Sequence, residues 1–116
     1  RAPQPRRVLL GDDSAFARGV LRGGLEMAGY RVTEAATAED LVRLLEQIQP
    51  DAVVTLPEWL EPLRGHQRGA TVPALALVEP GGASPAGESA ETKFDWPAML
   101  RSLEALTSAA PVEVAA

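Results

Sequence analysis

Short apolar runs alternate with amphipathic stretches through the first half of the chain. Residues 8–10 form a continuous apolar run, the pattern of a strand that is buried on both faces of a parallel sheet. Residues 30–35 and 51–55 fit two further strands. Between the strands, apolar residues recur at helical spacing, first at Ala17, Val20, Leu21, Leu25 and Ala28 and then at Leu41, Leu44, Leu45 and Ile48. Strands and helices in this order, with short connections, predict an α/β fold with a parallel sheet.

Polar residues mark where the two helices begin. Ser14 and Thr37 are suited to be N-caps, because a hydroxyl group can accept a hydrogen bond from a backbone N–H of the first turn. Pro50 ends the second helix and forces the preceding residue toward an extended conformation. The sequence therefore predicts one helix directly after residue 14 and another from residue 38 to about residue 48.

The second half of the chain is less regular. Residues 72–78 fit a fourth strand, but residues 57–71 contain Pro57, Pro62, Gly65 and Gly69 and leave room for only a short helix. Residues 80–87 are rich in proline and glycine and predict a flexible loop. A last helix is predicted after an N-cap at Asp95, with apolar residues at Trp96, Met99, Leu100 and Leu103.

The chain is predicted to hold a single domain. Its 116 residues suffice for one hydrophobic core. Residues 1–6 are predicted to be a linker or a tag remnant, residues 7–106 the domain, and residues 107–116 a flexible tail.

Composition narrows the classes of function. The formal charge of −5 disfavours nucleic acids and anionic membranes as partners. No apolar run approaches the roughly 18 residues of a membrane span, and no signal peptide is visible. The absence of cysteine excludes disulfides and thiolate metal sites and fits a cytoplasmic protein.

Two adjacent carboxylates, Asp12 and Asp13, directly follow the first predicted strand. A pair at the carboxyl end of a strand usually holds a hard cation such as Mg²⁺. The same pair also suits the N-terminus of a helix without any metal. The third strand ends at Thr55, where a third acid would complete a metal site, but Leu56 stands there. The chain therefore has the acidic pair that phosphoryl chemistry uses but lacks the third carboxylate.

Residues 8–14, 29–35 and 50–55 resemble the receiver domain of two-component response regulators. The resemblance implies a flavodoxin-like (CheY-like) doubly wound parallel sheet of five strands in the order 2-1-3-4-5, with the family's third and fourth helices shortened or lost. The run Lys93-Phe94-Asp95, followed by Leu100, Leu103 and Leu106, is similar more narrowly to receivers fused to the C-terminus of CheA-type chemotaxis histidine kinases.

The resemblance also assigns roles by position. In the family, an aspartate after the third strand accepts the phosphoryl group, an acidic pair holds Mg²⁺, and a hydroxyl and a lysine contact the phosphoryl oxygens. Asp12 and Asp13 match the acidic pair as a vestigial metal site, and Lys93 matches the lysine. Leu56 stands at the phosphoacceptor position and Val78 at the hydroxyl position, so no catalytic residue and no cofactor are expected. With the fold kept, Lys93 is expected to pair with Asp12 or Asp13 in place of a cation.

These expectations lead to one main hypothesis and two alternatives. The first is a degenerate receiver, not an enzyme, that acts as a phosphorylation-independent interaction or regulatory module, part of a CheA-type hybrid histidine kinase. Its surface is expected where the two helices have shrunk, at Trp59, Ala74 and Ala76, unless Trp59 and the loop rich in proline and glycine fold over that face instead. Its partner is a kinase core, a regulator or a second copy. The second is an atypical receiver that binds Mg²⁺ and accepts phosphate on a non-standard residue such as Glu58. The third is a small-ligand module with a pocket at the strand ends.

Overall fold

The predicted alternation of strands and helices is present in the computed structural model, which describes residues 4–108. Five parallel strands form one sheet in the order β2-β1-β3-β4-β5, as the resemblance implies. The strands are β1 (Arg7–Gly11), β2 (Arg31–Ala35), β3 (Ala52–Thr55), β4 (Ala74–Val78) and β5 (Ser89–Thr92). The last strand, β5, has no apolar pattern, since Ala90 is its only apolar residue. It is placed in the sheet by its parallel pairing with β4.

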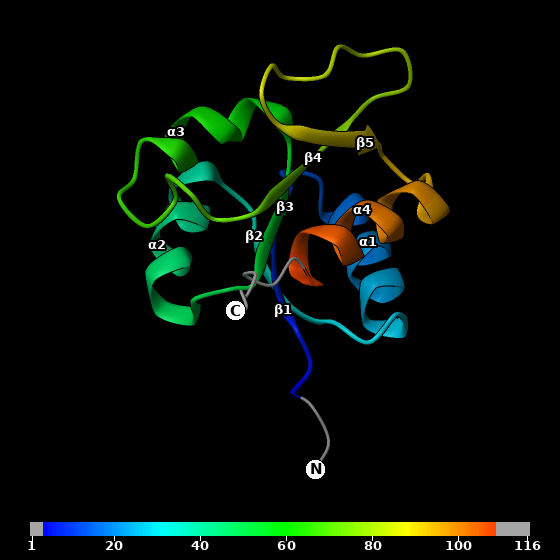
Figure 1. Ribbon diagram of the computed structural model, residues 1–116, viewed down its shortest axis with the longest axis horizontal. Helices are drawn as coiled ribbons and strands as arrows, with labels where there is room; N and C mark the ends of the chain where they lie inside the picture. Colours follow the sequence, from blue (N-terminus) through cyan, green and yellow to red (C-terminus); the bar gives the residue numbers. More distant parts are fainter. Residues whose placement is uncertain (1–3, 109–116) are drawn as a thin grey trace, which may run out of the picture.

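Helices cover both faces of the sheet (Figure 1). Helices α1 (Ala15–Met27) and α4 (Trp96–Ser108) lie on one face. Helices α2 (Ala38–Ile48) and α3 (Leu60–Arg64) lie on the other, with a 3-10 turn, η1 (Pro57–Trp59), leading into α3. No helix of residues 4–108 is long and apolar enough to cross a membrane.

The predicted N-caps are confirmed. The Ser14 hydroxyl accepts the N–H of Ala17 at 3.1 Å, and the Thr37 hydroxyl accepts the N–H of Asp40 at 3.0 Å. The Asp95 carboxylate accepts an N–H of the first turn of α4 at 3.4 Å. These bonds satisfy backbone donors that have no partner within the helix.

Not every residue of the predicted α1 stripe is buried. Ala17, Leu21 and Leu25 pack into the core, whereas Val20 is 40% exposed and Ala28 lies on the surface. The apolar residues Phe16 and Met27, on the same side of α1 as Val20 by helical periodicity, are 78% and 91% exposed. The helix is thus rotated so that part of its apolar surface faces solvent.

Side chains of β4 alternate between the two faces of the sheet. Leu75 and Leu77 belong to the core cluster under α1 and α4, and Ala74 and Ala76 to the cluster under α2 and α3. The prediction that these two alanines form an open interaction surface is wrong, because they are only 3% and 0% exposed. Alanine side chains are small enough for the short η1–α3 segment to approach and cover the strand, with Leu60, Leu63 and the half-buried Trp59 packed over it.

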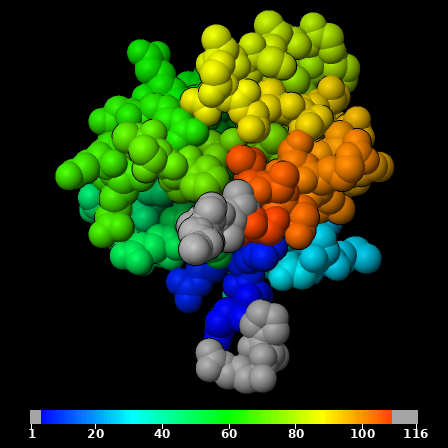
Figure 2. Space-filling model, viewed as in Figure 1, coloured from blue at the N-terminus to red at the C-terminus, as the bar shows by residue number. Residues whose placement is uncertain are grey.

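The connection from β4 to β5 contains no helix, so the family's fourth helix is absent from this part of the chain. The loop and β5 form the upper rim of the molecule above α4, coloured yellow in Figure 2. Arg64, at the end of α3, binds both carboxylate oxygens of Glu88 at 3.0 and 2.8 Å. It also donates to the carbonyl oxygens of Gly69 and Val72. One guanidinium group therefore ties α3, the loop after it and the start of β5 together.

The predicted domain boundaries remain predictions. Helix α4 continues to Ser108, two residues past the predicted domain end at residue 106, and residues 109–116 of the predicted tail lie outside the described residues. At the other end, the carbonyl oxygen of Arg6, in the predicted linker, accepts the N–H of Arg31 at 2.9 Å.

The adjacent glycines of α1 give a matched pair of variants. A Cβ at Gly24 would overlap the ring of Trp96, whereas a Cβ at Gly23 would have nothing within 4 Å. We expect Gly23→Ala to raise the free energy of unfolding by up to about 1 kcal/mol, the helix-propensity difference. We expect Gly24→Ala to lower it by about 1–3 kcal/mol through overpacking. Urea unfolding measures both, and equal effects of the two variants would contradict the packing of α1 on α4.

Candidate functional site

The residues singled out in the sequence gather where the strands end. Asp12 follows β1, Leu56 follows β3, Val78 ends β4 and Lys93 follows β5. Because parallel strands all end at the same edge of the sheet, four separate segments contribute to one site. Two backbone hydrogen bonds join these segments. The Leu56 N–H donates to the carbonyl oxygen of Gly11 at 3.2 Å, and the backbone N–H of Lys93 donates to the carbonyl oxygen of Val78 at 2.8 Å.

Asp12 is the buried carboxylate of this site, with 2% of its surface exposed. Its Oδ1 accepts the backbone N–H of Ser14 at 2.9 Å, which places the carboxylate at the start of α1. Its Oδ2 accepts a hydrogen bond from Lys93 Nζ at 2.8 Å. Both oxygens are therefore engaged, and the expected pairing of Lys93 with one of the two aspartates is confirmed for Asp12.

Lys93 is the only lysine in the chain. Its side chain is 9% exposed, and Nζ lies 3.5 Å from a carboxylate oxygen of Glu79 in addition to Asp12. Burial alone would lower the pKa of Lys93, but the hydrogen bond and charge of Asp12, with the charge of Glu79, outweigh it and raise the pKa above its ordinary value. The ammonium group is therefore a permanent positive charge at neutral pH.

By the resemblance to receivers, Leu56 and Val78 stand at the positions of the phosphoacceptor and the hydroxyl. Each side chain is 7% exposed. Neither offers a lone pair for nucleophilic attack or a donor for an oxyanion. The site therefore consists of one buried ion pair beside apolar side chains.

The structure does not bring Asp13 and Glu58 into this ion pair. Both residues are exposed, and neither has a salt bridge with another residue of the described part of the chain. Glu58 lies in the first turn of η1, on the stretch that leads away from β3.

The donor set does not fit Mg²⁺. Among residues 4–108 there is no cluster of three or more acidic, histidine or cysteine side chains that could hold a metal ion. Each oxygen of Asp12 already accepts one hydrogen bond, and the Lys93 ammonium beside it would repel a cation. The apolar Leu56 supplies no ligand.

Two residues near the site had not been singled out in the sequence. Glu79 directly follows β4, so the rule that parallel strands end together would have placed it near Lys93. Thr55 is 1% exposed, and its hydroxyl has no hydrogen-bond partner in the described part of the chain. A Cβ on Gly11 would lie 2.9 Å from that hydroxyl and 2.9 Å from the Trp59 ring, so any larger residue at the end of β1 would force these side chains to shift.

Comparisons with known proteins identify the fold. No protein-family model matches the chain. A putative response regulator from Chloroflexus aurantiacus superposes with a TM-score of 0.80 at 23% identity, covering 90% of this chain and 98% of the other. The chain has the CheY-like receiver fold. A receiver domain of a Pseudomonas aeruginosa sensor histidine kinase, with a magnesium ion coordinated in its active-site cleft, superposes with a TM-score of 0.77 at 24% identity, covering 89% and 98%.

The sequence resemblance to receivers is also supported. The chemotaxis protein CheY of Thermotoga maritima is 39% identical to the chain over 57 residues. That match spans about half of each protein, 46% of this chain and 48% of the relative. The predicted CheY-like fold and its strand order are therefore confirmed. The partial match to CheY supports the resemblance to receivers, and the chain's activity and partners are matters for proposal.

The ion pair of this receiver fold can be tested by stability. We expect Lys93→Met to lower the free energy of unfolding by about 3–5 kcal/mol, because it leaves the Asp12 carboxylate buried and unpaired. Arg101→Met, at an exposed position of α4, is the matched control and should change it by less than about 0.5 kcal/mol. Asp12→Asn combined with Lys93→Met should restore part of the loss. Urea unfolding that finds Lys93→Met as stable as the parent contradicts this account.

Proposed function

We propose that the domain is a degenerate receiver that acts in two-component signalling as a phosphorylation-independent interaction or regulatory module and not as an enzyme. One observation carries the proposal: Lys93 Nζ neutralises Asp12 at 2.8 Å while Leu56 stands at the phosphoacceptor position. The charge of the acidic residue is balanced within the chain itself.

Phosphoryl transfer needs two things that this arrangement does not supply. It needs a nucleophile with an available lone pair, and neither Leu56 nor Val78 has one. It also needs positive charge free to stabilise the transferred group. Here the Lys93 ammonium is held by Asp12 and Glu79. We therefore propose that the domain uses no Mg²⁺ and no other cofactor.

The alternative is an atypical receiver in which Glu58 accepts phosphate with the help of Mg²⁺. The exposed position of Glu58 would allow a donor to reach it. Nothing in the described residues pairs with its carboxylate or holds a cation beside it. This arrangement favours the interaction module over the atypical receiver.

The surface of the domain is compatible with an interaction role. The side chains of Phe16 and Met27 are 78% and 91% exposed on α1, and exposed apolar surface commonly marks contact with another protein. We propose a protein partner in the cytoplasm, and no nucleic acid or membrane, in keeping with the net charge of −5. We propose that the domain belongs to a CheA-type histidine kinase, supported by the resemblance of the run from Lys93 to Asp95, just before the last helix, to receivers of such kinases.

Incubation with acetyl phosphate and Mg²⁺ tests the proposal directly. We expect intact-mass spectrometry to show no added phosphoryl group on the chain without substitutions. We also expect beryllofluoride with Mg²⁺ to leave the tryptophan fluorescence unchanged, since Trp59 packs next to the end of β1 and would report a change there. A mass gain that Glu58→Gln abolishes would establish the atypical receiver instead.

A gain-of-function variant provides the positive control. Leu56→Asp together with Val78→Thr restores the acceptor and the hydroxyl that the family uses. A mass gain in this variant, but not in Val78→Thr alone, would show that the assay detects an acyl phosphate and that Leu56 is the block.

A further inference from the structure

The outer edge of β2 presents unpaired backbone groups. In the sheet, β2 pairs only with β1. Arg31 donates its N–H to the carbonyl of Arg6 at 2.9 Å, and the carbonyl of Ala35 accepts the N–H of Asp12 at 3.2 Å. Because the N–H and C=O of one residue in a parallel strand point to the same side, the backbone groups of Val32 and Glu34 point away from β1. Such an edge can template a further strand.

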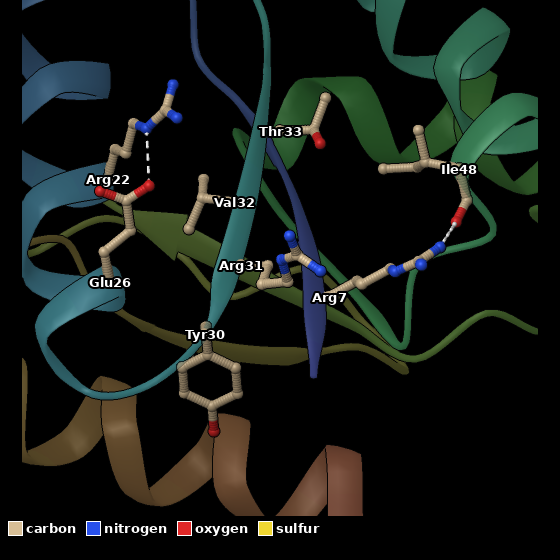
Figure 3. A pocket seen from close by; sticks show the side chains of 8 residues that line it. All are labelled: Arg7, Arg22, Glu26, Tyr30, Arg31, Val32, Thr33 and Ile48. Atoms are coloured by element: carbon tan, nitrogen blue, oxygen red, sulfur yellow. Dashed lines mark hydrogen bonds and ion pairs between the residues drawn. The ribbon is translucent and has the colours of Figure 1, made fainter. Parts of the chain in front are cut away.

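Two guanidinium groups lie side by side on the α2 face of this edge. Arg7 and Arg31 are register partners on β1 and β2 (Figure 3). Arg7 donates to the carbonyl oxygen of Ile48, at the end of α2, at 3.2 Å. Neither guanidinium group has a carboxylate within salt-bridge distance in the described part of the chain. The nearby Asp51 carboxylate accepts the backbone N–H of Arg7 at 2.7 Å. Like charges on paired strands repel, so the arrangement favours an added negative charge.

A third arginine flanks the edge on the α1 face. Arg22 is 44% exposed and binds Glu26 and Glu34, each at 2.9 Å, while Arg18 binds Glu34 at 3.0 Å. The hydrogen bond from Arg22, aided by Arg18, holds the pKa of Glu34 below its ordinary value despite partial burial. The one carboxylate on the edge strand is thus already neutralised and does not oppose an acidic ligand.

Arg7, Arg22 and Arg31 line an open groove along β2, together with Tyr30, Thr33, Ile48 and Glu26, whose carboxylate Arg22 binds. We propose that this groove binds an extended, acidic segment of a partner protein, which adds to β2 as a further strand. Its backbone would pair with Val32 and Glu34, and its carboxylates would face Arg7 and Arg31. A second copy of the chain is a poorer occupant, because it would bring the same arginines to the same edge. The inference rests on the proposed role as an interaction module and names its surface and the chemistry of its partner.

The probe is a short fluorescein-labelled peptide of alternating aspartate and valine, which places every carboxylate on one face of a strand. We expect fluorescence anisotropy to show binding to the parent domain. Arg31→Glu should weaken it at least about tenfold, a difference of about 1.4 kcal/mol. Arg31→Gln should weaken it less. Arg101→Glu, the matched control on exposed α4, should leave it unchanged. The same peptide with N-methylated backbone amides keeps its charge but cannot pair as a strand, and it should bind at least tenfold more weakly.

Several results would overturn the inference. These are no binding to the parent domain, equal binding of the methylated peptide, or equal weakening by Arg31→Glu and Arg101→Glu. A parent domain that sediments as a dimer, and that Arg31→Glu converts to a monomer, would assign the edge to a second copy. The acetyl phosphate experiment is independent of all of these. If the peptide does not bind and no mass gain is seen, only the proposed β2 surface is disproved. A mass gain would disprove the proposed function itself.

Discussion

The cost of burying a charge is the constraint on which the carboxyl edge of this sheet depends. Asp12 is 2% exposed, which is tolerable only because Lys93 and the Ser14 backbone occupy both of its oxygens. The Asp12–Lys93 pair joins the loop after β1, a central strand, to the loop after β5, an edge strand. Since the ammonium group supplies the positive charge from within the chain, an apolar Leu56 can end β3 without leaving a carboxylate unbalanced.

Loss of helical cover on one face is compensated by small strand residues and one arginine. Ala74 and Ala76 let η1 and α3 lie close to β4, so a short segment covers surface that a longer helix would otherwise bury. Arg64 then anchors that segment to Glu88 at the start of β5. The strand surface expected to be open is therefore covered at Ala74 and Ala76, whereas Phe16 and Met27 on α1 remain exposed.

The sequence could predict those residues of the site that lie directly at the ends of strands. Asp12, Leu56, Val78 and Lys93 could be placed because each adjoins a strand whose apolar pattern or family resemblance marked its position. The unpartnered Thr55 hydroxyl could not be foreseen, because whether a buried hydroxyl finds a partner depends on which residues the fold brings next to it. Which of two adjacent aspartates pairs with Lys93 also depends on the turn into α1, where Asp12 is buried and Asp13 exposed.

The sequence by itself determined the layered α/β architecture, the helix caps and the apolar residue that follows the third strand. These depend on the local spacing of apolar residues, on single polar residues at helix starts and on residue identity at strand ends. Only the tertiary structure decided which surfaces are covered, how Lys93 is held and which backbone groups of β2 remain free. Burial and electrostatic balance arise from residues far apart in the chain, and their contacts exist only once the strands are paired and the helices are packed on them.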